Sequence, residues 1–326
     1  MEFRTKINIP KTELSLSYNN HILMMGSCFI ENIGQILVDH RISAYLNPFG
    51  VLYNPLSIAQ GLDILIDNKK FTEEDLFEHK GLYHSFHHHS NFSHTDKTSC
   101  LENINKEINL AADFLKKTDT LFITFGTAYI YQWAKNNMIV GNCHKLPASE
   151  FNRSMLSTEN IIDRWIKLTE KLKAINPSLQ ILFTVSPIRH LRDGAHDNQL
   201  SKATLLIAID KLISSVNDTH YFPSYEIMLD DLRDYRFYNE DMIHPNTTAI
   251  KYIWDIFKNT YFPPKDRQIM DEWQKINQAI KHRPINKESE EHKSFLRQTL
   301  LKLKAFKNKY SYICLGNDIK DLESRL

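Results

Sequence analysis

A change of hydrophobic period at Gly26 constrains the fold of this chain more than any other feature. Residues 22–25 form an unbroken apolar run, which is typical of a buried strand. Beyond the glycine, apolar residues recur at helical spacing, at Phe29, Ile33, Ile36 and Leu37. The sequence therefore predicts a strand that turns directly into a helix at Gly26-Ser27-Cys28.

This turn would place a hydroxyl and a thiol at a helix N-terminus, among free backbone N–H groups and the positive end of the helix dipole. A nucleophile there is activated, and an oxyanion formed beside it finds donors already in place. The alternative is structural, with Ser27 capping the helix and Cys28 filling the core. Motifs elsewhere in the chain are needed to distinguish the catalytic from the structural interpretation.

Strands and helices are predicted to alternate after this turn, which indicates an α/β fold with a parallel, doubly wound sheet. The predicted strands cover residues 42–46, 120–125, 180–185 and 221–228, and the predicted helices cover 56–67, 101–117, 158–174, 199–216 and 247–258. Residues 68–99 are polar and predicted to form a loop. Glycines at positions 26, 50, 126 and 141 lie at or just after strand ends, where an open α/β sheet builds its site.

The composition changes after Pro263-Pro264, so we expect two parts: an α/β domain over residues 1–262 and a helical extension over 263–326. The extension has 14 Lys and Arg against nine Asp and Glu. We expect it to pack on the core or to join a second copy of the chain in a homo-oligomer. A weakly basic surface for an anionic partner is the other interpretation.

Overall charge and cysteine spacing exclude several classes of function. The net charge is +1, which gives no support to a dedicated nucleic-acid or membrane role, and no apolar run reaches the length of a membrane span. The N-terminal residues 1–12 lack a secretory apolar segment, so we expect a cytoplasmic protein. The cysteines at 28, 100, 143 and 314 have neither zinc-knuckle nor disulfide-scaffold spacing, and we expect no cofactor.

A second motif, Asp241-Met242-Ile243-His244, precedes the last core helix. Asp and His three residues apart in a turn can lie side by side, so that the carboxylate holds one imidazole nitrogen while the other faces a nucleophile. Asp241 and His244 are therefore the predicted partners of the thiol or hydroxyl at residues 27–28.

These motifs resemble the GSCFA family and, through it, the SGNH (GDSL-like) hydrolases. The resemblance covers roughly residues 20–258 and is carried by residues 26–34, 47–50, 124–128, 141–145, 186–190, 221–226 and 231–245. It implies a flavodoxin-like three-layer α/β/α fold. It also implies a nucleophile after the first strand, a glycine N–H after the second, here Gly50, and an Asp-x-x-His pair before the last helix.

The chain departs from the SGNH pattern at two places. Where those enzymes have Gly-Asp-Ser, this chain has Gly26-Ser27-Cys28, so that Cys28 occupies the nucleophile position unless the alignment shifts to Ser27. We favour Cys28, because a helix N-terminus depresses the pKa of a thiol. The family's oxyanion-binding Asn has no counterpart after Gly126, and either Asn142 or the Thr127 hydroxyl would complete the oxyanion hole with Gly50.

Histidines at 84, 87, 88, 89 and 94 allow a competing hypothesis of a zinc site, with His88, His94 and Asp96 as ligands. Their spacing matches no metal motif, so we predict no metal. We expect instead that His88 lines the pocket, together with Gly126, His144 and Arg189 as substrate-binding residues. Arg189 would bind an anionic group, and ion pairing within its loop is the alternative.

The sequence therefore predicts an acyl-ester hydrolase of the SGNH type, acting on an acylated carbohydrate or a small ester. Cys28 or Ser27 would attack the carbonyl, His244 would transfer the proton, and Asp241 would orient His244. One alternative is an acyltransferase that uses the same residues. A second is a non-catalytic protein that binds glycans or serves as a scaffold.

Overall fold

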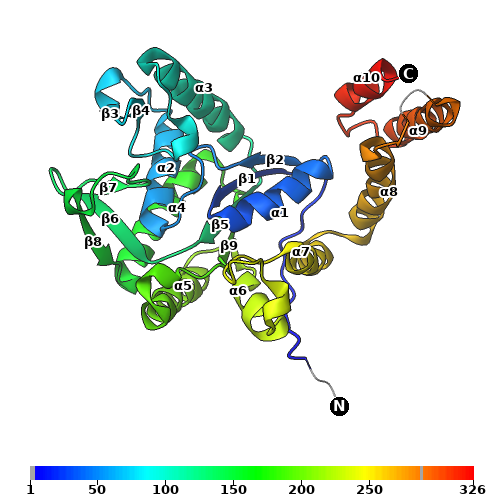
Figure 1. The fold of residues 1–326 in the computed structure, drawn as a ribbon. Helices are drawn as coiled ribbons and strands as arrows, with labels where there is room; N and C mark the ends of the chain where they lie inside the picture. Colours follow the sequence, from blue (N-terminus) through cyan, green and yellow to red (C-terminus); the bar gives the residue numbers. More distant parts are fainter. Residues whose placement is uncertain (1–3, 287–288) are drawn as a thin grey trace.

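A central parallel sheet lies between two layers of helices in the computed structural model, which describes residues 4–286 and 289–326 (Figure 1). In these residues the sheet has five strands in the order β10-β9-β5-β1-β2, and every pairing is parallel. The strands are β1 (His21–Gly26), β2 (Ser43–Leu46), β5 (Thr120–Phe125), β9 (Gln180–Val185) and β10 (Thr219–Tyr221). The prediction of a three-layer α/β/α fold with flavodoxin-like strand order is confirmed.

Alternate residues of the strands pack into two hydrophobic cores, one on each face of the sheet. Met24 and Phe122 pack into one core and Leu23 and Ile123 into the other. The first core is covered by α1 (Cys28–Asp39) and α7 (Thr247–Tyr261). The second core is covered by α2 (Pro55–Asp67), α3 (Lys97–Leu115), α4 (Thr158–Ile175) and α5 (Ala195–Ser215).

Polar residues just before several helices fix where each helix begins. Asn54 accepts the N–H of Ser57 at the start of α2, and Asn246 accepts the N–H groups of Thr248 and Ala249 at the start of α7. Asp96 and Ser157 cap α3 and α4 in the same way. Each cap stabilises a helix start by about 1 kcal/mol.

Two small antiparallel elements were not predicted, and one of them lies in the loop predicted over residues 68–99. The strands β6 (Tyr129–Trp133), β7 (Ile139–Val140) and β8 (Phe151–Met155) form a side sheet, and β3 (Phe77–His79) pairs with β4 (Leu82–His84). Their strands have two to five residues each, which is too short for a period-2 pattern to reveal them. The strand predicted over 221–228 is wrong beyond Tyr221, because the chain turns helical in α6 (Ser224–Glu226) and over Ile227–Asp231.

The C-terminal helices α8 (Pro264–Lys281), α9 (Glu290–Lys309) and α10 (Gly316–Ser324) extend from the α/β layers beyond α7 (Figure 1). Trp273 is buried, and its indole N–H donates to the carbonyl of Asp39 at the end of α1 at 2.6 Å. Arg41 lies over the Trp273 ring and pairs with Asp318 of α10. The extension thus packs on the end of α1. The domain boundary at residue 262 and an association between copies stay predictions.

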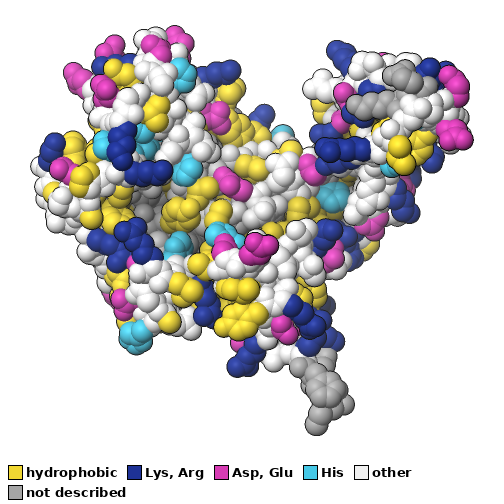
Figure 2. All heavy atoms as spheres, viewed as in Figure 1, with side chains coloured by type: hydrophobic (Ala, Val, Ile, Leu, Met, Phe, Trp, Pro, Cys, Tyr) yellow, Lys and Arg dark blue, Asp and Glu magenta, His cyan; other side chains and the backbone are white. Residues whose placement is uncertain are grey.

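Charged side chains of both signs are interspersed over the face drawn in Figure 2, in keeping with the net charge of +1. Within the described parts of the chain, no helix combines the length and apolar character needed to cross a membrane.

Candidate active site

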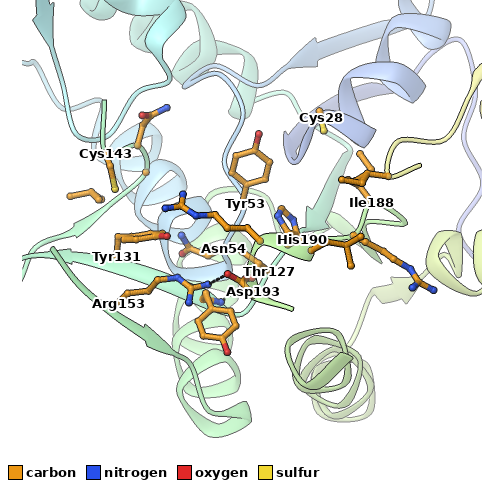
Figure 3. A pocket seen from close by; sticks show the side chains of 18 of the residues that line it. Cys28, Tyr53, Asn54, Thr127, Tyr131, Cys143, Arg153, Ile188, His190 and Asp193 are labelled. Atoms are coloured by element: carbon orange, nitrogen blue, oxygen red, sulfur yellow. Dashed lines mark hydrogen bonds and ion pairs between the residues drawn. The ribbon is translucent and has the colours of Figure 1, made fainter. Parts of the chain in front are cut away.

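Five segments that leave the carboxyl edge of the sheet line one cavity of about 500 Å³. They follow β1, β2, β5, β9 and β10, and the side sheet forms a further wall (Figure 3). The lining residues are Cys28, Tyr53, Asn54, Thr127, Tyr129, Tyr131, Val140, Gly141, Asn142, Cys143, Arg153, residues 188–193, Ile243 and His244. This is the edge at which open α/β folds bind their ligands.

The strand–turn–helix prediction for residues 22–37 is confirmed. Gly26 ends β1 with φ +145°, and a Cβ there would lie 2.3 Å from the carbonyl oxygen of Thr124 on the neighbouring strand. The Gly26 N–H donates to the Asn47 side chain at 2.9 Å, which fixes the strand end to the loop after β2. This close contact allows α1 to begin at Cys28, directly above the sheet edge.

Ser27 and Cys28 occupy different environments. Ser27 is 1% exposed and does not line the cavity, and its Oγ accepts the N–H of Phe29 as the N-cap of α1. Cys28 is half-buried and faces the cavity. The geometry therefore gives Ser27 the capping role and leaves Cys28 as the residue that a substrate can reach.

The expectation that the helix N-terminus lowers the pKa of Cys28 is wrong. Burial raises the pKa of this thiol above its ordinary 9.0, and the nearby carboxylate of Glu31 raises it further. The backbone N–H groups of Cys28 and Phe29 and the ammonium of Lys202 act in the opposite direction without reversing the shift. Cys28 is thus a thiol at neutral pH, so its attack requires a base.

Asp241 and His244 form the predicted pair. The imidazole Nδ1 lies 2.6 Å from Oδ2 of Asp241, while Oδ1 accepts the backbone N–H groups of Ile243 and His244 at 2.9 Å each. These bonds lower the pKa of Asp241 to about 2. His244 lines the cavity with Cys28, and no hydrogen bond joins the two side chains.

Of the three candidate oxyanion donors, two line the cavity and one does not. The N–H of Gly50 donates to the carbonyl of Asn47 at 2.7 Å, and Gly50 does not line the cavity, so it does not fill the role predicted for it. Asn142 and Thr127 do line it. The Asn142 oxygen accepts the N–H of His144, which leaves its NH₂ group to donate, whereas the Thr127 hydroxyl is bonded to Ser201.

Three of the predicted substrate-binding residues lie outside the cavity. Gly126 donates its N–H to the carbonyl of Tyr53. His88 is fully buried among Phe49, Phe71 and Phe92, with a pKa lowered to about 3 by burial.

His144 is also buried, bonded to the Ser85 carbonyl and packed against the tilted ring of His84. The predicted zinc ligands do not converge either. His94 is exposed and accepts the N–H of Asp96. Among the described residues, no three His, Cys, Asp or Glu side chains are arranged to hold a metal ion.

Of the predicted substrate contacts, only Arg189 lines the cavity, on the segment that follows β9. In the same segment, His190 packs edge-on against Tyr53 at 5.6 Å, and its pKa is lowered to about 4, first by burial and then by Lys202. Asp193 pairs with Arg153 of β8 at 2.5 Å (Figure 3). This pair ties the segment after β9 to the side sheet.

Lys202 of α5 lies buried beside the site and was missed by the sequence analysis. It is 1% exposed, and its Nζ donates to the carbonyls of Gly126 and Ser186 at 2.7 Å each, just beyond the ends of β5 and β9. Burial lowers its pKa to about 7. In the sequence, the spacing of polar and apolar residues along this helix does not indicate that Lys202 is buried.

Tyr53 and Arg153 were also missed as lining residues. Tyr53 follows the Asn47–Gly50 turn, and this position after β2 was the only indication in the sequence that it could line the cavity. In the charged segment that precedes Asp241, Asp231 pairs with Arg4 and accepts a hydrogen bond from the Tyr252 hydroxyl, away from the turn of His244.

Comparison with known proteins identifies the family of this chain and one distant structural neighbour. A crystal structure of a carbohydrate esterase family 3 from Talaromyces cellulolyticus shares 8% identity, covering 78% of this chain and 99% of its own, with a TM-score of 0.36. No curated protein matches the chain. Residues 21–257 match the GSCFA family, and residues 273–326 match the C-terminal domain of GSCFA domain proteins. The chain therefore belongs to the GSCFA family.

Proposed function

We propose that this protein is an acyl-ester hydrolase of the SGNH type with Cys28 as its nucleophile. The observation that carries the proposal is the shared cavity of Cys28, at the start of α1, and His244, held by Asp241. Thiol, imidazole and carboxylate from distant parts of the chain are the set that covalent acyl transfer requires. The flavodoxin-like strand order, with the site at the carboxyl edge, supports the relation to SGNH hydrolases.

The first step forms a bond between Sγ of Cys28 and the carbonyl carbon of the ester. Because burial keeps the thiol protonated, Nε2 of His244 takes its proton as the bond forms. The carbon–alkoxide bond then breaks, the leaving oxygen receives that proton, and a thioester remains. Water attacks the thioester with His244 again as base, which releases the acid and restores the thiol.

Because no hydrogen bond joins Cys28 and His244, the proposed proton transfer requires a bridging water or a closure of the turn at residues 241–244. Catalytic hydrogen bonds are often long before substrate binds. Met242 in this turn has φ +57° and is half-exposed, so little packing holds the turn in place. The oxyanion would accept from the N–H of Cys28 and from the NH₂ of Asn142.

Acyl transfer to a hydroxyl would use the same residues, since it differs only in the acceptor that resolves the thioester. An acylated carbohydrate is compatible with the lining tyrosines Tyr53 and Tyr131, whose rings can pack against sugar rings. A non-catalytic glycan-binding protein would keep the cavity without turnover.

Intact-mass measurement after brief exposure to 4-nitrophenyl acetate tests the proposal. We expect a gain of one acetyl group, mapped to Cys28, in wild type and in Ser27→Ala, and none in Cys28→Ala. Cys143 lines the same cavity, and burial raises its pKa to about 11, so Cys143→Ser distinguishes attack by Cys28 from general thiol reactivity. All proteins carry Cys314→Ser, because Cys314 is exposed.

In His244→Ala the acetyl group should form at a much lower rate, since the base is gone. Acetylation that persists in Cys28→Ala, or a rate that does not respond to loss of His244, would overturn the proposed mechanism.

A further inference from the structure

The cavity wall carries more positive than negative charge. Three arginines line it, at 153, 189 and 192, and Asp193 is the one carboxylate among its lining residues. Asp193 is already engaged, because it pairs with Arg153, whose guanidinium also lies 3.8 Å over the ring of Tyr129. Two guanidinium groups are therefore left without a counter-charge from the wall.

Arg189 and Arg192 flank His190 on the segment that follows β9. Neither forms an ion pair or a side-chain hydrogen bond with any residue that the structure describes. The Nε of Arg189 is buried and has no hydrogen-bond partner, which is unfavourable for a charged donor unless a ligand supplies the acceptor. Arg189 also borders an adjoining cavity that Asp230 and Asp234 line, and its charge acts on Tyr238 there.

Arg192 is exposed, and its charge acts across the cavity on Cys143. The lining histidine between the two arginines adds no positive charge, because His190 is neutral at neutral pH. Figure 2 shows Lys, Arg and His side chains around the hollow of this face, with Asp and Glu side chains beside them. The part of the wall formed by these arginines is thus positive, whereas the Glu31 carboxylate acts on Cys28. Arginines bind carboxylate and phosphate groups through paired N–H donors.

We propose that the substrate is an anionic ester, whose carboxylate or phosphate group is bound by Arg189 and Arg192 while its carbonyl faces Cys28. The inference rests on the proposed function and names the substrate class of the same site. The two arginines are then specificity-determining residues, and an ester without the negative charge would bind weakly.

Calorimetric binding to the Cys28→Ala protein tests this without turnover. Three stable amides are compared: N-methylsuccinamate, its phosphonate analogue, and a neutral isostere with an isopropyl group in place of the carboxylate. We expect at least one charged amide to bind about tenfold more tightly than the neutral one, as for loss of one charge-assisted contact. Whichever of the carboxylate and the phosphonate binds more tightly identifies the anionic group that the site prefers.

Arg189→Met and Arg192→Met should each remove most of this preference, and Arg192→Lys should restore part of it. Arg297→Met on α9, an exposed arginine far from the cavity, is the matched control and should keep it. Raising the ionic strength should weaken binding of the charged amide only. Equal affinity for charged and neutral amides, or a preference that survives both substitutions, would overturn the inference.

Acylation by 4-nitrophenyl hemisuccinate and by its neutral isostere separates this inference from the proposed function. Equal acylation of Cys28 by both esters would overturn the anion preference and leave the hydrolase standing. Tight binding of the charged amide with no acylation of Cys28 by either ester would support the anion site and overturn the hydrolase.

Discussion

Replacing Lys202 by Met should change how the stability of the protein depends on pH. The ammonium of Lys202 is buried, and among the described residues no carboxylate hydrogen-bonds or pairs with it. Burial therefore lowers its pKa from 10.5 to about 7. Methionine has a similar length and no charge, so the variant removes the titration and keeps most of the packing volume.

The sign of the effect follows from proton binding. Between pH 7 and 10.5 the unfolded chain keeps the Lys202 proton while the folded protein has lost it, so the free energy of unfolding rises with pH. Integration from pH 7 to pH 9 gives a gain of about 2 kcal/mol for the wild type relative to the variant. Below pH 6 both states are protonated and this difference becomes constant.

Urea unfolding of wild type and Lys202→Met at several pH values between 6 and 9 measures the difference. Lys167→Met, at an exposed lysine of α4, controls for the loss of a surface charge. Carrying out both series in a Cys28→Ala background removes the electrostatic coupling between Lys202 and the thiol. Wild-type and Lys202→Met curves that run parallel from pH 6 to pH 9 would refute the reasoning.

Three further predictions follow from contacts at the site. Glu31→Gln should increase alkylation of Cys28 by iodoacetamide severalfold at neutral pH, since the Glu31 carboxylate raises the pKa of the thiol; an unchanged rate would contradict this. Asp241→Asn should lower kcat about a thousandfold with an unchanged melting temperature, because the amide no longer orients His244. Gly26→Ala should destabilise the fold by about 3 kcal/mol or more in urea unfolding, since its Cβ would meet the Thr124 carbonyl.

The parts of the fold that were predicted correctly have strong local signals. The change of period at Gly26 and the apolar run of β5 each depend on neighbours in the sequence. The side sheet β6–β8 escaped prediction because its order comes from pairing across the chain, as between Tyr129 and Met155. Because the strands of the central sheet are parallel, the segments that follow them leave at the same edge. This explains why residues 28 and 244 line one cavity.

The parts of the site that could not be predicted depend on burial. His88 and His144 were expected to line the pocket, yet both are buried in aromatic surroundings outside the cavity. The pKa of Cys28 is a second example, since the favourable helix terminus is visible in the sequence and the stronger effect of desolvation is not.

The opposite pKa shifts of Cys28 and Lys202 argue that the thiolate is formed only during attack. The ammonium of Lys202 loses its proton above about pH 7, whereas the thiol of Cys28 ionises by itself only above its ordinary 9.0. The two charged forms therefore overlap little at equilibrium, and a stable thiolate–ammonium pair does not build up. A base that removes the proton as the carbon–sulfur bond forms becomes necessary, and His244 is the lining imidazole that has a carboxylate partner. Lys202 then contributes most at and below neutral pH, where its charge favours the transient anion.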